Sequence, residues 1–350
     1  MSSGWFDRLC EGVEARGWSP VVMTTEGGRL LAVRENARLL GVEVAGAGDN
    51  GVWHDPAFED PKGSGPISGG GGDRLWIAPE VAYYWPSLEL ARKDAGKYAI
   101  LPADVDPGRY AEVSSDAKGV AYGTTATLKD HRVGVTIAFE VLRTFRLCEP
   151  LAGLGEGVTC LSYAMENRLT LGSGDFGAVA GAWSICQVPT GGVLHCPTVR
   201  EALAEVTSYY EPFGERVTVD GDGVRFRVDG LAKIKMGIAA SATSGRMGYY
   251  RETEAGALLM LRAFPSLPGE PYVDVPISAE SKQRYGRDVL QAYNHDGGPE
   301  TFGEMEYHDP ALVVGRGPEV RSGVSVTHAV FGEAAKVRAV GEAFLGMRVG

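Results

Sequence analysis

Residues 133–143 read Val-Gly-Val-Thr-Ile-Ala-Phe-Glu-Val-Leu-Arg. Apolar side chains recur at every second position, at Val135, Ile137, Phe139 and Val141. Because successive side chains of a strand point to opposite faces, this period predicts a β-strand with one buried face. The stretch therefore favours a sheet over a helix at the centre of the chain.

Short runs of the same kind extend through most of the sequence. The 350 residues include 49 glycines, about twice the usual share of roughly 7%, and they separate the apolar runs as turns do. Turn signals about every 8–12 residues, with little helix between them, are typical of a sandwich or barrel and not of alternating βαβ units. The expected strands include 21–24, 29–33, 37–44, 97–101, 119–128, 133–147, 161–171, 181–188, 234–240, 257–264, 305–308 and 324–330.

The fold class expected from these runs is all-β. Helical periodicity is confined to residues 3–16, residues 198–206 and residues 334–345, the last of which also fits a strand with a helical end. We expect residues 1–20 to form an N-terminal helical extension and residues 21–350 to form one β domain, because hairpin signals continue on both sides of the loop-like segment 60–72.

Composition excludes several classes of partner. A net charge of −11 and a pI near 5.2 argue against nucleic acid and anionic membrane surfaces, which need clustered lysine and arginine. No apolar run approaches the length of a membrane span, and the N-terminus lacks the apolar core of a signal peptide. The five cysteines are odd in number and lack Cys-x-x-Cys spacing, which indicates a reducing, cytoplasmic location.

The sequence predicts neither a metal nor a cofactor. None of the six histidines has His-x-x-x-His or His-x-His spacing. Residues 46–51 and 172–177 match Gly-x-Gly-x-x-Gly by letter, but neither opens a predicted helix, so both are interpreted as turns.

One candidate site begins in the glycine-rich stretch 69–80, which reads Gly-Gly-Gly-Gly-Asp-Arg-Leu-Trp-Ile-Ala-Pro-Glu. A flexible loop here delivers Asp73, Arg74 and Trp76 to the edge of a predicted strand. These residue types suit a polar, ring-shaped ligand such as a sugar, and the alternative is a solvent loop with an ion pair. Trp183 is a second tryptophan that could stack on a sugar ring, although tryptophan is more often a core residue.

A second candidate lies late in the chain. Glu304, Glu306 and His308 alternate, so in a strand they share one face, which is either solvent or the floor of a polar cleft. A carboxylate in a partly desolvated cleft has a raised pKa and can act as a general base. Lys235 occupies a similar alternating position and either protects a sheet edge or faces the same cleft.

Several of these motifs together resemble galactose mutarotase-like (aldose 1-epimerase-like) proteins, and the likeness extends over residues 21–331. The run 38–56 resembles the N-terminal strands of that superfamily, and Gly71-Gly72-Asp73-Arg74-Leu75-Trp76 resembles its arginine-bearing loop. Met305-Glu306-Tyr307-His308-Asp309-Pro310-Ala311 resembles the late strand that carries the general base. A bacterial branch with Gly-Gly-Asp-Arg-x-Trp-x-x-Pro-Glu early and Glu-x-Glu late is the most similar.

The resemblance implies a β-supersandwich of large twisted antiparallel sheets with a sugar-binding cleft. It implies a substrate-binding role for Arg74 and a general-base role for Glu306. The superfamily's histidine motifs are missing, since Trp183 and Ser184 stand where one is expected. The general acid would then have to be His195, His131 or Lys235.

The function expected from these observations is binding of a small-molecule carbohydrate, with epimerisation by general acid–base chemistry. In this hypothesis Glu306 acts with His195 or His131, and Arg74, Asp73, Trp76, Trp183, Lys235, Glu304 and His308 contact the sugar. Two alternatives remain: a non-catalytic sugar-binding module, and a lyase or hydrolase that pairs Glu304 with Glu306. The expected assembly is a monomer or homodimer.

Overall fold

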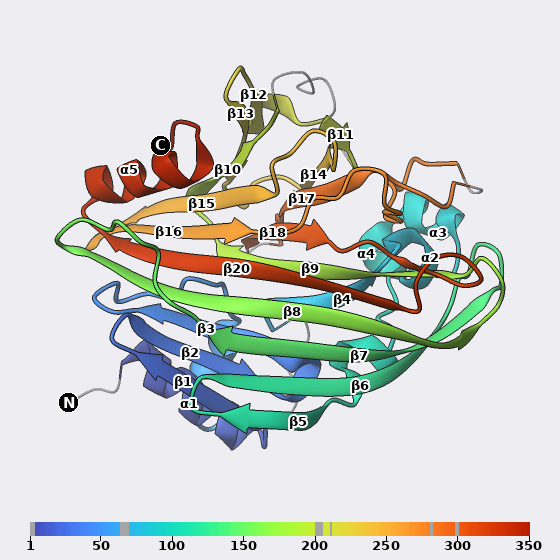
Figure 1. Ribbon diagram of the computed structural model, residues 1–350, viewed down its shortest axis with the longest axis horizontal. Coiled ribbons are helices and arrows are strands. Elements are labelled where there is room, and N and C mark those ends of the chain that lie inside the picture. Colours follow the sequence, from blue (N-terminus) through green and yellow to red (C-terminus); the bar gives the residue numbers. More distant parts are fainter. Residues whose placement is uncertain (1–3, 64–69, 200–205, 211, 281–282, 298–300) are drawn as a thin grey trace.

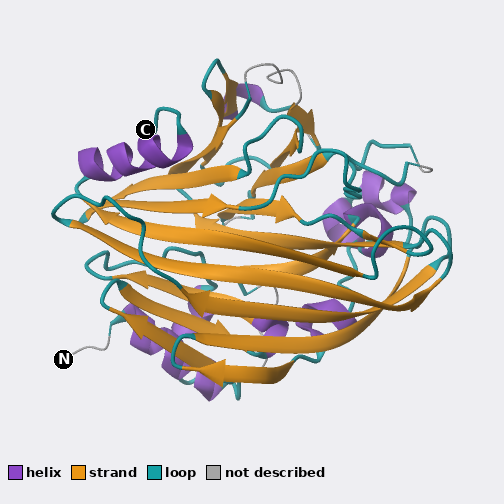
Figure 2. Ribbon diagram, in the orientation of Figure 1, coloured by secondary structure: helices purple, strands orange, loops and turns teal. Residues whose placement is uncertain are grey.

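Two large antiparallel sheets make up most of the molecule (Figures 1 and 2). The computed structural model describes residues 4–63, 70–199, 206–210, 212–280, 283–297 and 301–350. Within these residues each sheet contains ten strands. The all-β prediction is therefore confirmed, and the strands pack as two layers with few helices at their margins.

The first sheet carries the candidate site. Its strand order is β1-β2-β3-β4-β9-β18-β17-β14-β11, and β19 pairs with β9 outside this path. The bounds are β1 (Pro20–Thr25), β2 (Gly28–Val33), β3 (Arg38–Val44), β4 (Asp73–Ala78), β9 (Val179–Pro189), β11 (Val206–Ser208), β14 (Ile234–Ala239), β17 (Asp288–Asn294), β18 (Phe302–His308) and β19 (Leu312–Val313).

The second sheet contains the longest strands. Its order is β12-β13-β10-β15-β16-β20-β8-β7-β6-β5. The bounds are β5 (Ala111–Asp116), β6 (Gly119–Lys129), β7 (Thr136–Leu147), β8 (Val158–Gly174), β10 (Gly192–Pro197), β12 (Val217–Val219), β13 (Gly223–Val228), β15 (Arg246–Thr253), β16 (Gly256–Ala263) and β20 (Val320–Gly332).

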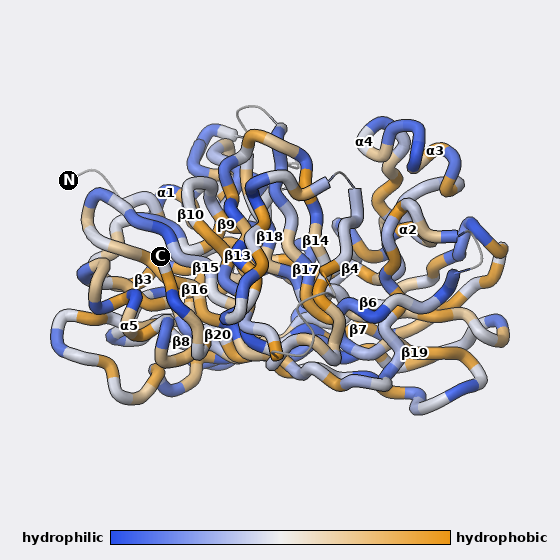
Figure 3. Tube along the Cα trace, turned by 90° about the horizontal axis from the view of Figure 1, so that it is seen from above, coloured by the Kyte–Doolittle hydropathy of each residue, from blue (hydrophilic) through white to orange (hydrophobic). Residues whose placement is uncertain are grey.

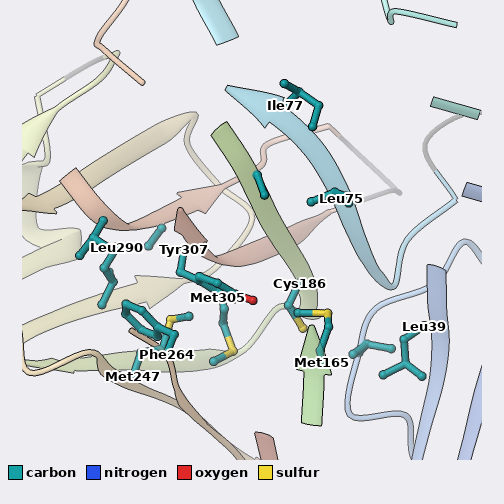
Figure 4. Packing of buried hydrophobic residues seen from close by; sticks show 14 of the residues in the cluster. Leu39, Leu75, Ile77, Met165, Cys186, Met247, Phe264, Leu290, Met305 and Tyr307 are labelled. Atoms are coloured by element: carbon teal, nitrogen blue, oxygen red, sulfur yellow. The ribbon is translucent and has the colours of Figure 1, made fainter. Parts of the chain in front are cut away.

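The main core fills the space between the sheets. The alternating run in β7 buries Ile137, Phe139 and Val141 there, as its period predicts. Figure 4 shows part of this packing, with Met165 of β8 beside Cys186 of β9. Because every second residue of β4, β9, β17 and β18 points into the core, the residues between them occupy the opposite face of the first sheet.

Five α-helices flank the sheets within the described residues: α1 (Trp5–Ala15), α2 (Glu80–Tyr83), α3 (Leu88–Lys93), α4 (Ala95–Tyr98) and α5 (Ala334–Leu345). The expected N-terminal helix is α1, and residues 334–345 form α5 in full. No helix in the described ranges is long and apolar enough to cross a membrane. Most of the helix expected at 198–206 lies outside the described residues.

The prediction of a strand at residues 97–101 is wrong. Residues 95–98 form the short helix α4, whose first turn is capped when the Asp94 carboxylate accepts a hydrogen bond from the Lys97 amide. Ile100 and Leu101, which suggested a strand, are largely exposed. Their apolar side chains therefore do not belong to the buried face of a strand.

A buried ion cluster joins the two sheets through Asp73 of β4. Arg143 of β7 donates to the Asp73 carboxylate at 2.7 Å, and Arg262 of β16 donates to its other oxygen. All three side chains are fully buried. Burial alone would raise the pKa of Asp73, but Arg262 and Arg143 hold it below the ordinary value.

This cluster corrects the expectation for Asp73. Its side chain points between the sheets and not toward the opposite face, because it alternates with Arg74 along β4. Ser184 of β9 also donates to it, at 3.2 Å. Asp73 therefore acts as a structural anion in the core and does not line the candidate site.

Candidate functional site

A cavity of about 230 Å³ lies on the face of the first sheet that points away from the core. Strands β4, β9, β18, β17 and β14 are neighbours there, and helices α2, α3 and α4 gather at one end of them (Figure 3). The lining residues are Arg74, Trp76, Glu80, Trp85, Ala95, Gly96, Ala99, Trp183, Tyr210, Lys233, Lys235, Tyr293, His295, Phe302 and Glu304.

Aromatic rings form much of the cavity wall. Trp76 of β4 stacks on Tyr84, with ring centroids 4.6 Å apart, and meets Trp183 of β9 edge-on at 5.5 Å. The Trp76 indole N–H donates to Asp106 at 2.9 Å, which fixes the orientation of the ring. The structure therefore places both tryptophans in the wall of one cavity.

Arg74 is held from two sides. Its guanidinium lies 3.2 Å from the Glu304 carboxylate and 4.2 Å from the Trp76 ring centroid. Gln187 of β9 donates to the same Glu304 oxygen at 3.0 Å. Arg74 is only 7% exposed, so it is a preorganised cleft residue and not a surface ion-pair partner.

Lys235 lies between two carboxylates. Its Nζ is 3.4 Å from Glu80 Oε2 and 3.4 Å from Glu306 Oε2. Burial lowers the pKa of Lys235, but the surrounding carboxylates outweigh this effect and hold it above the ordinary value. The Nζ also lies 4.2 Å from the Trp183 ring centroid, where a cation–π contact adds to the attraction.

Glu306 is enclosed behind this lysine. It accepts a 2.7 Å hydrogen bond from the Trp183 indole N–H, and its side chain has no exposed surface. Burial raises the pKa of Glu306 to about 8, against the opposing charge of Lys235. Since Glu306 does not line the cavity, a ring in the cavity would meet Glu80 and Lys235 before it met Glu306.

Glu80 is a candidate that the sequence reasoning missed. It begins α2, lines the cavity, and its backbone amide donates to Asp274 at 2.8 Å. The Tyr210 hydroxyl donates to its carboxylate at 3.4 Å, and burial raises its pKa. The only available signal was its place at the end of the stretch 69–80, since a one-turn helix has no periodicity to reveal which way it faces.

The predicted alternation in β18 is correct, but the solvent alternative is not. Glu304, Glu306 and His308 share the cavity-side face while Met305 and Tyr307 enter the core, and all five are buried. The His308 ring stacks on Trp183 with centroids 5.4 Å apart. Burial lowers its pKa to about 4, so His308 is a neutral packing partner near neutral pH.

The two histidines expected to supply the acid do not line the cavity. His195 lies in β10 of the second sheet, opposite Arg225, and burial lowers its pKa to about 4. His131 lies in the exposed turn after β6, where its backbone amide donates to Ala82. The structure therefore brings together Arg74, Trp76, Trp183, Lys235, Glu304, Glu306 and His308, and leaves these two apart.

The described residues contain no metal cluster of the usual ligand types. No group of three or more His, Cys, Asp or Glu residues there has metal-binding geometry. A larger hollow of about 510 Å³ lies beside Cys148 and Cys160, but its wall contains no aromatic ring. The cavity on the first sheet is therefore where charged and aromatic groups converge.

Comparison with known proteins identifies the family. Residues 58–350 match a family of unknown function, DUF6786. The chain belongs to the DUF6786 family. Every cavity residue named above lies within the part that matches DUF6786. A search of curated proteins found no match.

Solved structures similar to this DUF6786 chain include three galactose mutarotase relatives. A galactose mutarotase related enzyme from Lactobacillus acidophilus is 9% identical, with a TM-score of 0.49 over 89% of this chain and 97% of that one. A galactose mutarotase-like protein from Lactobacillus casei is 7% identical, with a TM-score of 0.48; the match covers 89% of this chain and 100% of that one. An aldose epimerase homologue from C. elegans is 10% identical, with a TM-score of 0.47; the match covers 89% of this chain and 98% of that one.

Proposed function

We propose that this protein binds a monosaccharide-sized carbohydrate in the cavity on its first sheet. The observation that supports the proposal is the division of the cavity wall into aromatic rings and ion-paired groups. Trp76, Tyr210 and Tyr293 contribute partly exposed aromatic surface, while Glu80, Glu304 and Arg74 offer fixed acceptors and donors. A sugar ring presents the complementary surfaces, apolar C–H faces and polar hydroxyl edges.

The size of the cavity supports a single ring. Drug-sized ligands occupy clefts of roughly 300–1,000 Å³. The cavity here has about 230 Å³, which is below that range. The polar groups are also held before a ligand arrives, since Arg74 and Glu304 already contact each other, and preorganisation lowers the ordering cost of binding.

Replacing Arg74 by alanine should weaken sugar binding at least tenfold. The change removes guanidinium donors and leaves Glu304 without its cation. Calorimetric titration with a panel of neutral and acidic monosaccharides measures the effect. Arg146→Ala is the matched control, because Arg146 forms an exposed ion pair with Asp116 in the second sheet and should leave binding unchanged. Equal affinities for wild type and Arg74→Ala would argue against the cavity as the binding site.

A second candidate function is interconversion of the anomers of the bound sugar. It is favoured by the contact of Lys235 with two carboxylates, Glu80 and Glu306, whose pKa values burial raises. Shifted pKa values cluster at sites of acid–base chemistry. In this scheme Glu80 removes the proton of the anomeric hydroxyl and Lys235 donates one to the ring oxygen; the ring opens, rotates and closes. Glu306 positions the Lys235 ammonium through their 3.4 Å contact.

Changing Glu80 to glutamine should then lower the catalysed rate by about 10²–10⁴-fold, the usual contribution of general acid–base catalysis. NMR of freshly dissolved single anomers measures the rate after the spontaneous reaction is subtracted. Glu112→Gln, an exposed change in β5, is the control. Binding retained by Glu80→Gln with the rate lost would support catalysis. A wild-type rate equal to that of Glu80→Gln would leave a binding protein.

A further inference from the structure

Lys233 differs from the other cations of the cavity. Arg74 and Lys235 each contact a carboxylate. Lys233 precedes β14, is half-buried and lines the same cavity, yet no carboxylate of the described residues lies within ion-pair distance of it. Among the described residues it contacts the Tyr210 ring, with the Nζ 5.2 Å from the ring centroid.

From this unpaired ammonium we propose that the ligand is an acidic monosaccharide, a sugar ring with a carboxylate group, and that Lys233 binds that carboxylate. The inference rests on the proposed binding of a carbohydrate in this cavity and names its class. A half-buried ammonium beside a cavity gains most from an anion that enters with the ligand, because desolvation strengthens the attraction.

The arrangement around Tyr210 separates the two ends of such a ligand. The Lys233 ammonium lies over the face of the Tyr210 ring, and the Tyr210 hydroxyl donates a hydrogen bond to Glu80. Tyr293 meets Tyr210 edge-on, with centroids 6.1 Å apart, and completes this side of the wall. A carboxylate at Lys233 is thus next to an ammonium and an aromatic surface, and the ring hydroxyls are left to Glu80 and Glu304.

The number of charges favours a carboxylate over a phosphate ester. A phosphate monoester carries about −1.5 to −2 charges at pH 7, whereas a carboxylate carries one. Only one cation lining the cavity, Lys233, is without a carboxylate partner among the described residues, and Glu80 and Glu304 also line the cavity and would repel a dianion. The single charge of a uronate matches the single ammonium.

The test is a calorimetric comparison of sodium glucuronate and galacturonate with glucose, galactose and glucose 6-phosphate. We expect the uronates to bind at least tenfold more tightly than the neutral sugars and the phosphate ester, and we expect high salt to reduce this preference. Lys233→Gln should lower the affinity for uronates to that for neutral sugars, and Lys233→Arg should restore part of the preference. Lys129→Gln, an exposed lysine change at the end of β6, is the matched control.

The possible outcomes distinguish the acidic-sugar inference from the proposal that the cavity binds a carbohydrate. Neutral sugars that bind as tightly as uronates would overturn the acidic ligand. A uronate preference that survives Lys233→Gln would overturn the role of Lys233. Carbohydrate binding stands in both cases. Tighter binding of glucose 6-phosphate would overturn the carboxylate assignment. Absence of binding by every sugar would overturn both.

Discussion

Replacing Asp73 by asparagine should lower the free energy of unfolding by about 3–5 kcal/mol, the usual cost of removing one partner of a buried ion pair. The carboxylate of Asp73 is the shared counter-ion of Arg143 and Arg262, and all three side chains are fully buried between the sheets. Asparagine keeps the shape but supplies no charge, so both guanidinium groups are left uncompensated. Against a typical total stability of about 5–15 kcal/mol, this is a large loss.

Urea denaturation of Asp73→Asn beside wild type measures the change. Asp116→Asn is the matched control, because Asp116 forms an exposed ion pair with Arg146 in the same molecule and should leave the midpoint unchanged. If Asp73→Asn is not recovered in folded form while Asp116→Asn is, the result points the same way. A midpoint that does not move would show that the cluster contributes little to stability.

The fold class was predictable from the sequence because the alternation of apolar and polar residues is its dominant signal. A strand in a two-layer sheet buries every second side chain, so Ile137, Phe139 and Val141 reveal both the strand and its buried face. The same rule fails where apolar residues are exposed. Ile100 and Leu101 produced a false strand beside α4, since local sequence does not say which apolar residues find a partner.

The candidate site was predictable where it lies on strands. Alternation correctly placed Glu304, Glu306 and His308 on one face, opposite to Met305. Strands β4 and β18, which flank β9 in the sheet, bring Arg74 within 3.2 Å of Glu304, although 230 positions separate them along the chain. That distance depends on strand order, which no local motif contains.

The wrong predictions of site residues arise where local sequence does not determine which way a side chain points or which sheet a strand joins. Asp73 looked like a ligand contact because it precedes Arg74, but neighbouring residues of a strand point to opposite faces. Glu80 was missed because a one-turn helix has no period. His195 was placed near Glu306 by elimination, whereas its strand β10 belongs to the other sheet.

Raising the pH from 6.5 to 8 should destabilise the protein through Glu306. The pKa of this carboxyl is about 8 in the folded chain against an ordinary value of 4.5. The folded state therefore holds a proton that the unfolded state has already lost, and stability falls as pH rises, by at most about 1.4 kcal/mol per pH unit for one proton. The buried histidines oppose this trend up to about pH 7.5, because their unfolded forms, with an ordinary pKa of 6.5, still carry part of their protons there. The contribution of Glu306 is therefore measured as a difference between two proteins that share these histidines.

Glu306→Gln should remove this part of the pH dependence. Asp309, whose pKa burial raises to about 7, contributes a fall of the same sign in both proteins, so the difference between them isolates Glu306. Urea denaturation of both at four pH values between 6.5 and 8 gives that difference, and parallel curves would contradict the assignment.

The same measurement bears on catalysis. Lys235 contacts both Glu80 and Glu306, and burial raises the pKa of each carboxyl. If Glu306 holds its proton to pH 8, Glu80 is the other carboxylate beside Lys235 and the one that lines the cavity. A cavity carboxyl that contacts an ammonium and has a raised pKa is suited to act as a general base on a sugar hydroxyl.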